Sequence, residues 1–380
     1  MKLTQIATLL NETLVPNYLG EETTIAEDLS NIVELGDAIA NLDGDEVKNF
    51  AGDFIVGVAR NVMDTRNYRR DTYGLMNDAR EYGGVIQRVK AKLLGASDSP
   101  IWTLESGQDY FDGKYYGIET DVKIYSKDTA FQVKNSIPTE MYKQYFTSAD
   151  GVREFVAMIE STVDNTITVE LNVLAKTTLQ QLIATVSADR SISLLSLYNT
   201  SAGLTGADQL TADDALHNAP FLRWCAEQIV RLRDMTQDYN EKYNDGTVPT
   251  FTPAEDLRVT LLSEFARAIE FNMEADTFHR DLVSVGEYNT INFWQNASDS
   301  LLPSLGVTAE VKTVTGENEP VTISNVVGII HDRYTAGLTA RHDKITAQYI
   351  ANGDYTTYFH HVANSRFIDT RNTAVILRLV

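Results

Sequence analysis

The sequence has few of the residues on which disulfides, metal sites and most nucleophilic catalysis depend. It contains one cysteine, Cys225, and six histidines among 380 residues. A single cysteine excludes a disulfide within the chain, and its apolar neighbours predict a buried small side chain and not a reactive thiol. No apolar run approaches the roughly 18 residues of a membrane-spanning helix, and the N-terminal residues are too short and polar a stretch for a signal peptide. We therefore expect no membrane contact and a cytoplasmic location, at least before any assembly.

Basic residues are also scarce. The chain has 32 lysines and arginines against 53 aspartates and glutamates, a formal net charge of -21. Neutralising phosphates requires clustered cations, so this balance argues against a general nucleic-acid-binding surface. It suits a container whose walls should not adhere to a polyanion inside. Apolar residues make up 43% and charged residues 22%, which predicts an ordinary packed core.

Motifs for cofactor, metal and substrate chemistry are missing as well. None of G-x-G-x-x-G, G-x-S-x-G or H-E-x-x-H occurs. The stretch Gly107 to Lys114 is similar to a phosphate-binding loop, but its glycines stand one residue too far apart and Tyr115 replaces the magnesium-binding serine or threonine. His360 and His361 are neighbours whose side chains point apart in a strand, so we expect structural roles for them. We predict a protein that is not an enzyme, with no catalytic, cofactor-binding or metal-binding residues.

A long helix is the clearest predicted element. Between residues 147 and 187, apolar residues recur at steps of three and four, with the polar Thr178 in the one gap. Thr147 and Asp150 form a potential capping pair at its start. About forty residues at ~1.5 Å per residue give a rod of roughly 60 Å, long enough to act as a scaffold spine. The stripe consists of Val152, Val156, Ile159, Val163, Ile167, Leu171, Leu174, Leu182 and Val186.

Residues 100–137 are typical of a long β-hairpin. Apolar and polar residues alternate from Ile118 to Ile124, residues 126–128 form a turn, and a second alternation follows. A lone two-stranded ribbon is marginal in water, so it either docks on another subunit or belongs to a sheet of its own chain. The candidate assembly-interface residues are Tyr116, Ile118, Val122, Ile124, Phe131 and Val133.

The rest of the chain divides into an acidic arm and a compact α/β unit. Residues 1 to about 95 are predicted to be helical or irregular, ending in a strand near Val85–Lys90. Residues 188 to about 325 are predicted to form the α/β unit, and an apolar C-terminal strand should be buried inside a sheet. The expected elements are a helix from Asp213 towards Tyr239, a turn at Asn244–Gly246, a strand at Leu257–Leu262, a helix at Phe265–Phe271, and strands at Val321–Ile330 and Ala374–Val380.

The order of these elements, and several short motifs, resemble the major capsid proteins of tailed bacteriophages with the Hong Kong 97 type of fold, especially phages of Gram-positive bacteria. The matching residues are Tyr82-Gly83-Gly84-Val85-Ile86-Gln87-Arg88, Pro100-Ile101-Trp102, Phe146-Thr147-Ser148-Ala149-Asp150, Phe155 through Glu160, Phe251-Thr252-Pro253-Ala254, Asp276-Thr277-Phe278-His279, Phe293-Trp294-Gln295 and Asp332-Arg333-x-x-x-Gly337-x-Thr339. Two departures are His331, where a large apolar residue is expected, and a basic tail after Asn364.

The resemblance implies an α+β capsid fold with five parts. These are an N-terminal arm (1–96), an extended β-hairpin loop (97–146), the spine helix of a peripheral domain (147–190), an axial domain (191–325) and a C-terminal return through the sheets (326–380). It implies hexamers and pentamers that close into an icosahedral shell around double-stranded DNA, without sequence-specific DNA binding. The implied partners are scaffolding and portal proteins, the implied location is the virion capsid after assembly in the host cytoplasm, and no cofactor is implied.

Three alternatives stay open from the sequence, and one of them is a tail protein or another virion protein. An encapsulin-like compartment would have the same fold with an enzyme cargo inside. A soluble hydrolase using paired carboxylates belongs to a different class, since a chain with 53 acidic residues can supply such a pair although none stands out.

Overall fold

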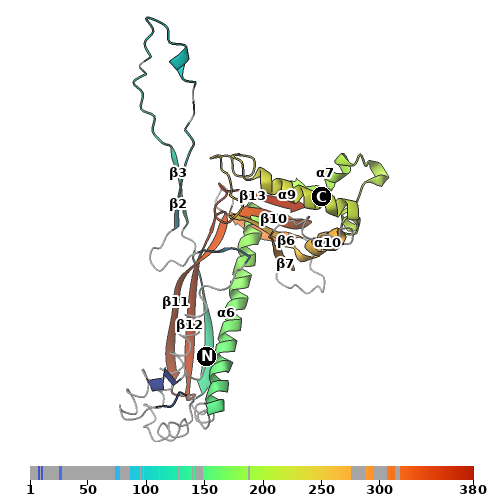
Figure 1. The fold of residues 1–380 in the computed structure, drawn as a ribbon. Helices are drawn as coiled ribbons and strands as arrows, with labels where there is room; N and C mark the ends of the chain where they lie inside the picture. Colours follow the sequence, from blue (N-terminus) through green and yellow to red (C-terminus); the bar gives the residue numbers. More distant parts are fainter. Residues whose placement is uncertain are drawn as a thin grey trace.

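The structure, a computed structural model, describes most of the chain from Ile86 onward and short pieces before it. The described residues are 7–8, 10–11, 25–27, 73–77, 86–94, 96, 98–110, 112–125, 128–138, 141, 149–186, 189–274, 287–294, 306–312 and 317–380. Figure 1 shows a long helix with long strands beside it, a body of helices and strands at one end of that helix, and a ribbon projecting beyond the body. The predicted α+β class is confirmed.

The predicted long helix is present as α6, Ala149–Val186. From Phe155 onward its buried side chains recur every three or four residues, so one stripe of the helix packs inward. Thr178 is fully buried within this stripe, and its hydroxyl donates to the Leu174 carbonyl at 2.8 Å, which satisfies it without another element. The capping pair at Thr147 lies outside the described residues, as do the side chains of Val152 and Val156. The buried apolar members are Phe155, Ile159, Val163, Ile167, Leu174, Leu182 and Val186.

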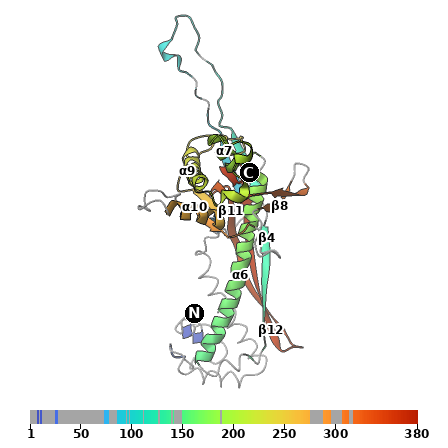
Figure 2. The same ribbon diagram turned by 90° about the vertical axis from the view of Figure 1, so that its right-hand side faces the viewer.

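A four-stranded sheet lies along α6 in the order β1-β11-β12-β4 (Figures 1 and 2). The helix contacts three of its strands, β4, β11 and β12. Along β12, the side chains of Tyr358, His360 and Val362 are buried while those of Phe359 and His361 between them are half-buried. His360 and His361 therefore face opposite sides of the sheet, as predicted. The strands are β1 (Met76–Asn77), β4 (Asp128–Pro138), β11 (Ala336–Ile350) and β12 (Tyr355–Ile368).

The body is built on a five-stranded sheet in the order β5-β13-β10-β6-β7. The C-terminal strand β13 (Ala374–Arg378) pairs with β5 on one side and β10 on the other, so its apolar side chains are buried inside the sheet as predicted. The predicted strand at residues 257–262 and helix near 265–271 are confirmed as β6 and α10. The other elements are β5 (Ser191–Ser193), β6 (Leu257–Leu262), β7 (Asn289–Ile291), β10 (Val326–Asp332), α7 (Leu194–Ser201), α8 (Ala212–Ala215), α9 (Ala219–Met235), α10 (Ser263–Glu274), and the 3-10 turns Pro100–Trp102 and Gly206–Asp208.

Two predicted elements of the body are each divided in the structure. The single helix expected from Asp213 towards Tyr239 is α8 followed by α9, because the Asn218 side chain accepts a hydrogen bond from the Phe221 amide at 3.0 Å and so begins a new helix. The strand expected at 321–330 is two strands, β9 (Asn318–Ile323), which pairs with β8 (Val307–Lys312), and β10. The chain turns between them at Asn325, whose φ is 55°.

The prediction of a β-hairpin within residues 100–137 is wrong. Strand β3 (Thr120–Tyr125) pairs with β2 (Ile86–Ala91), whereas β4 pairs with β12 in the long sheet. Alternating residues identified both strands correctly but did not identify their partners, which lie more than 25 residues away in the sequence. The projecting ribbon is therefore β2 and β3 together with the connection between them, residues 86–125, and this ribbon is the upper feature of Figure 1.

Two other expectations concern burial. Cys225 is buried on α9, and burial raises the pKa of its thiol, as expected for a structural cysteine.

Among the described helices, none is both long and apolar enough to cross a membrane. The helical or irregular structure predicted for the arm falls largely outside the described residues, although Ala7, Leu10 and Ile25 are buried there.

The packed stripe of α6 predicts a selective effect on stability. Replacing the fully buried Leu182 by alanine should lower the free energy of unfolding of the unassembled subunit by about 2–5 kcal/mol, because a cavity remains in the core. Val169 lies on the same helix but is 58% exposed, and Val169→Ala should cost less than about 0.5 kcal/mol. Urea unfolding followed by circular dichroism measures both changes. Equal losses would contradict the assignment of the packed face.

Candidate assembly interfaces

The β2–β3 ribbon has two faces of opposite character. On one face the side chains are half-buried or buried against the body, and most of them are charged. On the other face the side chains are exposed and mainly apolar, with Val89 57%, Val122 44% and Ile124 66% exposed. Val89 and Val122 stand directly opposite one another in the register. A ribbon of a monomeric protein normally shows the reverse arrangement, with its apolar face inward.

Arg371 holds both strands of the ribbon to the body. Its side chain is fully buried in the connection between β12 and β13. Nε and Nη2 donate to the two carboxylate oxygens of Asp369 at 2.9 and 2.8 Å, a bidentate pair. Nη1 donates to the carbonyl and the carboxylate of Asp121 on β3 at 2.9 and 3.0 Å, and Nη2 reaches the Arg88 carbonyl on β2 at 3.3 Å. One guanidinium therefore joins the two strands to the body.

Three cations of the ribbon add contacts around this centre. Lys90 donates to the Arg371 carbonyl at 2.9 Å, and Lys123 donates to Asp245 at 3.2 Å. Arg88 donates to the Tyr334 carbonyl at 2.6 Å, and its guanidinium lies 4.0 Å from the centre of the Phe367 ring. The charged face of the ribbon is thus matched, group by group, with acceptors on the body.

The carboxylates at this contact stay ionised at neutral pH. Burial raises the pKa of Asp369, but the hydrogen bond and positive charge of Arg371 outweigh it and the pKa lies below its usual value. Burial has the same effect on Asp245, where hydrogen bonds from Thr247, Thr370 and Lys123 lower the pKa to about 2. Asp369 and Asp245 therefore keep their negative charge across the physiological range.

A buried polar network fixes the turn beneath the ribbon. The Thr252 hydroxyl lies 3.0 Å from an Asp332 carboxylate oxygen and 2.9 Å from the Thr373 hydroxyl. The other oxygen of Asp332 accepts from the Tyr334 amide at 2.7 Å, and the Thr335 hydroxyl donates to the Thr373 carbonyl at 2.8 Å. Burial raises the pKa of Asp332. Two motifs that are far apart in the sequence, around Thr252 and around Asp332, therefore meet in one hydrogen-bonded turn.

Exposed apolar side chains are concentrated on the ribbon. Of the 22 large apolar residues that are exposed in the described part of the chain, 12 lie between residues 86 and 125. Trp102 is 92% exposed and Tyr115 94% exposed. Exposed apolar residues that are concentrated on one projection indicate an interaction surface, unlike the single exposed apolar residues found on most proteins. The twelve are Val89, Leu93, Leu94, Ile101, Trp102, Leu104, Tyr110, Tyr115, Tyr116, Ile118, Val122 and Ile124.

The six candidate interface residues fall into two groups. Tyr116, Ile118, Val122 and Ile124 are exposed on the ribbon. The remaining two, Phe131 and Val133, are half-buried on β4, where they line a groove of about 380 Å³ against α6. The sequence reasoning missed Val89 and Trp102, because β2 was not recognised as the partner of β3. It also missed Arg371, whose one signal was the unusual basic tail.

The structure describes no site for chemistry in these regions. The described residues include no group of three or more histidine, cysteine or acidic side chains that could hold a metal ion. Gly107 and Lys114, the ends of the stretch similar to a phosphate-binding loop, are both exposed on the ribbon. His331 is completely buried on β10, and burial lowers its pKa to about 4, so it is neutral at physiological pH.

Comparison with known proteins agrees with this architecture. A family model described as Phi29-like phage major capsid protein matches residues 11–377. Among solved structures, the capsid of Staphylococcus phage Andhra superposes with a TM-score of 0.53 at 10% identity, over 83% of this chain and 84% of that chain. The structure of the head fiber and inner core protein gp22 of native bacteriophage P68 gives a TM-score of 0.49 at 11% identity, over 80% and 83%. No curated protein matches the sequence. The likeness to the capsid of Staphylococcus phage Andhra shows a shared fold.

The contacts of Arg371 predict that its removal frees the base of the ribbon. Arg371→Met should destabilise the unassembled subunit by about 3–5 kcal/mol, because Asp369 is left buried without its partner. Trypsin should then cut faster after Arg88 and Lys90, which the docked ribbon protects. Cleavage after Lys114, already exposed, should be unchanged and serves as the internal control.

A double variant distinguishes the effect of losing the Arg371–Asp369 ion pair from a general destabilisation of the subunit. Asp369→Asn combined with Arg371→Met removes the uncompensated carboxylate and should recover part of the lost stability, although the ribbon stays undocked. Unchanged cleavage after Arg88 in both variants would show that Arg371 does not hold the ribbon.

Proposed function

We propose, from the premise that the chain belongs to the Phi29-like phage major capsid protein family, that copies of it join through the outward face of the β2–β3 ribbon. The protein forms the head shell of a phage, is located in the virion capsid, and is structural and not an enzyme. Its fold is the mixed α+β fold of Hong Kong 97-like phage capsids. The main support for this proposal is the orientation of the β2–β3 ribbon. Its charged face lies against the body and its apolar face is exposed to solvent.

The isolated subunit leaves apolar side chains of the ribbon exposed, and their burial between copies would stabilise a shell. Covering a valine or isoleucine side chain contributes about 1.5–3 kcal/mol, so Val89, Val122 and Ile124 together contribute several kcal/mol per ribbon. In a ring each copy gives one ribbon and receives another, so the contribution is repeated at every interface. These contacts must outweigh the repulsion between subunits that each carry a charge of -21.

The parts of the fold suit distinct roles in such a shell. We take the ribbon as the extended loop, with bounds 86–125 in place of the 97–146 expected from the sequence. The helix α6 with the long sheet would form the peripheral domain around residues 147–190, and residues 191–325 the axial domain, with 326–380 returning through both sheets. Residues 1–85 would form the arm, in place of the 1–96 expected from the sequence. Two observations support this division. Strands β4, β11 and β12 lie against α6, while β6, β10 and β13 form the sheet of the body.

The proposal extends to the contents and partners of the shell. Hexamers and pentamers of this chain would close into an icosahedral head around double-stranded DNA, without sequence-specific contacts. Scaffolding and portal proteins would assist assembly, which takes place in the host cytoplasm. The scarcity of cations supports a wall that does not adhere to the enclosed polyanion. No observation favours an enzyme-carrying compartment, and the hydrolase alternative is set aside by the family match.

Changing the outward face of the ribbon tests the proposal. The triple variant Val89→Thr, Val122→Thr and Ile124→Thr keeps β-branched side chains, so the ribbon and the subunit should fold as before. Shell formation should be lost or require a protein concentration at least about tenfold higher, since several kcal/mol of burial per contact is removed. Electron microscopy with size-exclusion chromatography measures the yield of shells.

Val230→Thr is the matched control, because Val230 is also exposed but lies on α9, away from the ribbon. It should assemble like the unmodified protein. Normal shell yield from the triple variant would refute the role of the ribbon, provided that its melting temperature shows an intact subunit.

A further inference from the structure

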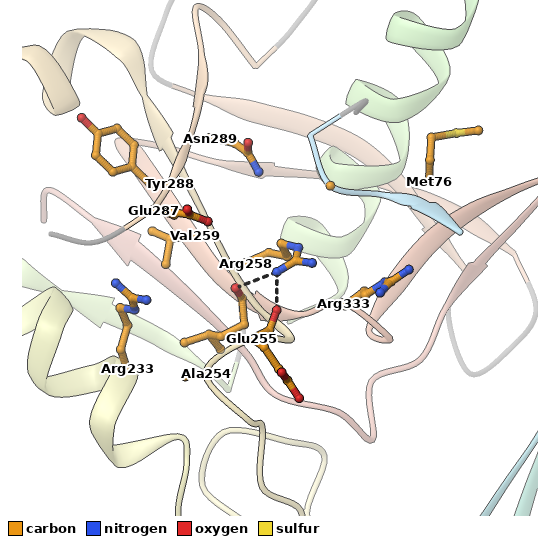
Figure 3. Close-up of a pocket in the computed structure, with 12 residues that line it drawn as sticks. Met76, Arg233, Ala254, Glu255, Arg258, Val259, Glu287, Tyr288, Asn289 and Arg333 are labelled. Carbon is orange, nitrogen blue, oxygen red and sulfur yellow. Dashed lines mark hydrogen bonds between the residues drawn. The ribbon is translucent and has the colours of Figure 1, made fainter. Parts of the chain in front are cut away.

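Three arginines line a hollow of about 790 Å³ in the body (Figure 3). Arg233 comes from the last turn of α9, Arg258 from β6, and Arg333 from the turn that follows β10. They belong to elements that are distant in the sequence, so the fold itself brings them together. Such a gathering of guanidinium groups is unexpected in a chain whose net charge is -21.

Arg258 is held in position before any ligand arrives. Its Nη1 donates to the Glu255 carbonyl at 2.7 Å and to the Leu257 carbonyl at 3.3 Å, the two bonds drawn in Figure 3. Gly74 packs against its stem: a Cβ at Gly74 would lie 3.0 Å from Cδ of Arg258, and the φ of +70° there also favours glycine. The guanidinium is therefore fixed by contacts that leave its charge uncompensated.

Among the described residues, neither Arg258 nor Arg333 has a carboxylate partner. Within the described part of the chain, no acidic oxygen lies within 4.0 Å of either guanidinium. Arg333 contacts the Tyr334 ring, whose centre is 5.9 Å away. Acidic residues outnumber basic ones 53 to 32, so two arginines that face a hollow without an acidic partner among the described residues point to an anionic ligand.

The sequence contains a matching anion. Residues 3–47 include ten aspartates and glutamates and not one lysine or arginine. The described residues of this segment, 7–8, 10–11 and 25–27, lie near the far end of α6, at the opposite end of that helix from the body (Figure 1). A helix of 38 residues is about 55 Å long, so these described residues lie far from the hollow of their own copy.

We propose that Arg258 and Arg333 bind carboxylates of the acidic segment, residues 3–47, of a second copy. The proposal rests on the assembly function proposed above and adds a second contact between copies, independent of the ribbon. Guanidinium groups bind carboxylates through paired hydrogen bonds, which gives the contact both strength and direction. It joins the end of one subunit to the body of the next, a heterologous contact of the kind that builds rings.

The composition of the hollow favours a peptide over nucleic acid. Glu255 and Glu287 also line it, and they would repel the closely spaced phosphates of a DNA strand. A peptide can place separate carboxylates at the arginines and neutral residues beside the two glutamates. The hollow is also bordered by β1 and β7, each at the edge of its sheet, where an extended segment can add main-chain hydrogen bonds.

Peptide binding to the unassembled subunit tests this contact without requiring shells. A fluorescent peptide of residues 20–46, which has nine acidic and no basic residues, is titrated with full-length protein at a concentration below that of assembly. Fluorescence anisotropy should show saturable binding that weakens about tenfold or more in Arg258→Gln and in Arg333→Gln. No hydrogen bond from the Arg333 side chain is present in the described part of the chain, so Arg333→Gln should leave folding intact.

Three controls decide the outcome. Arg267→Gln, an exposed arginine on α10, should bind the peptide normally. A peptide with its nine acids changed to the corresponding amides should not bind, and neither should a 20-base-pair DNA duplex. Equal binding by the unmodified protein and both arginine variants would overturn the proposal. So would arginine-dependent binding of the duplex without binding of the peptide. Either result leaves the ribbon contact standing, since that contact is measured by shell formation.

Discussion

The buried pair of Arg371 and Asp369 is the interaction on which the exposed apolar surface depends. A two-stranded ribbon with an apolar face would normally turn that face onto its own body. Here the charged face is fastened to the body by one guanidinium that reaches both strands, so the apolar face is left in solvent. A buried ion pair contributes little net stability, but it does specify one orientation among several. That orientation is what makes the subunit ready to associate.

The few lysines and arginines of this acidic chain include a group with a clear structural role. The chain has only 32 lysines and arginines, yet four of them, Arg88, Lys90, Lys123 and Arg371, gather at the base of the ribbon. Others line the hollow of the body. The chain as a whole keeps a net charge of -21, which suits a wall around a polyanion.

How much of this could be predicted from the sequence depended on the range of the interactions. The helix α6 was predicted within two residues, because its stripe repeats over 38 residues and needs only local information. Strand β3 was found for the same reason, but its pairing with β2 was not, since alternation says nothing about the partner. Arg371 could not be assigned at all, because Asp121 lies 250 residues away. The break at Asn218 was missed although the residue is a common helix cap, because the apolar periodicity continued across it.

The separation of 250 residues between Asp121 and Arg371 also imposes an order in time. During translation, both strands of the ribbon leave the ribosome long before the residue that orients them has been made. At about 5–20 residues per second, this interval lasts roughly 12–50 seconds. During this interval the ribbon lacks the one contact that joins both of its strands to the body. The orientation of its apolar face is therefore completed only after residue 371 has been made.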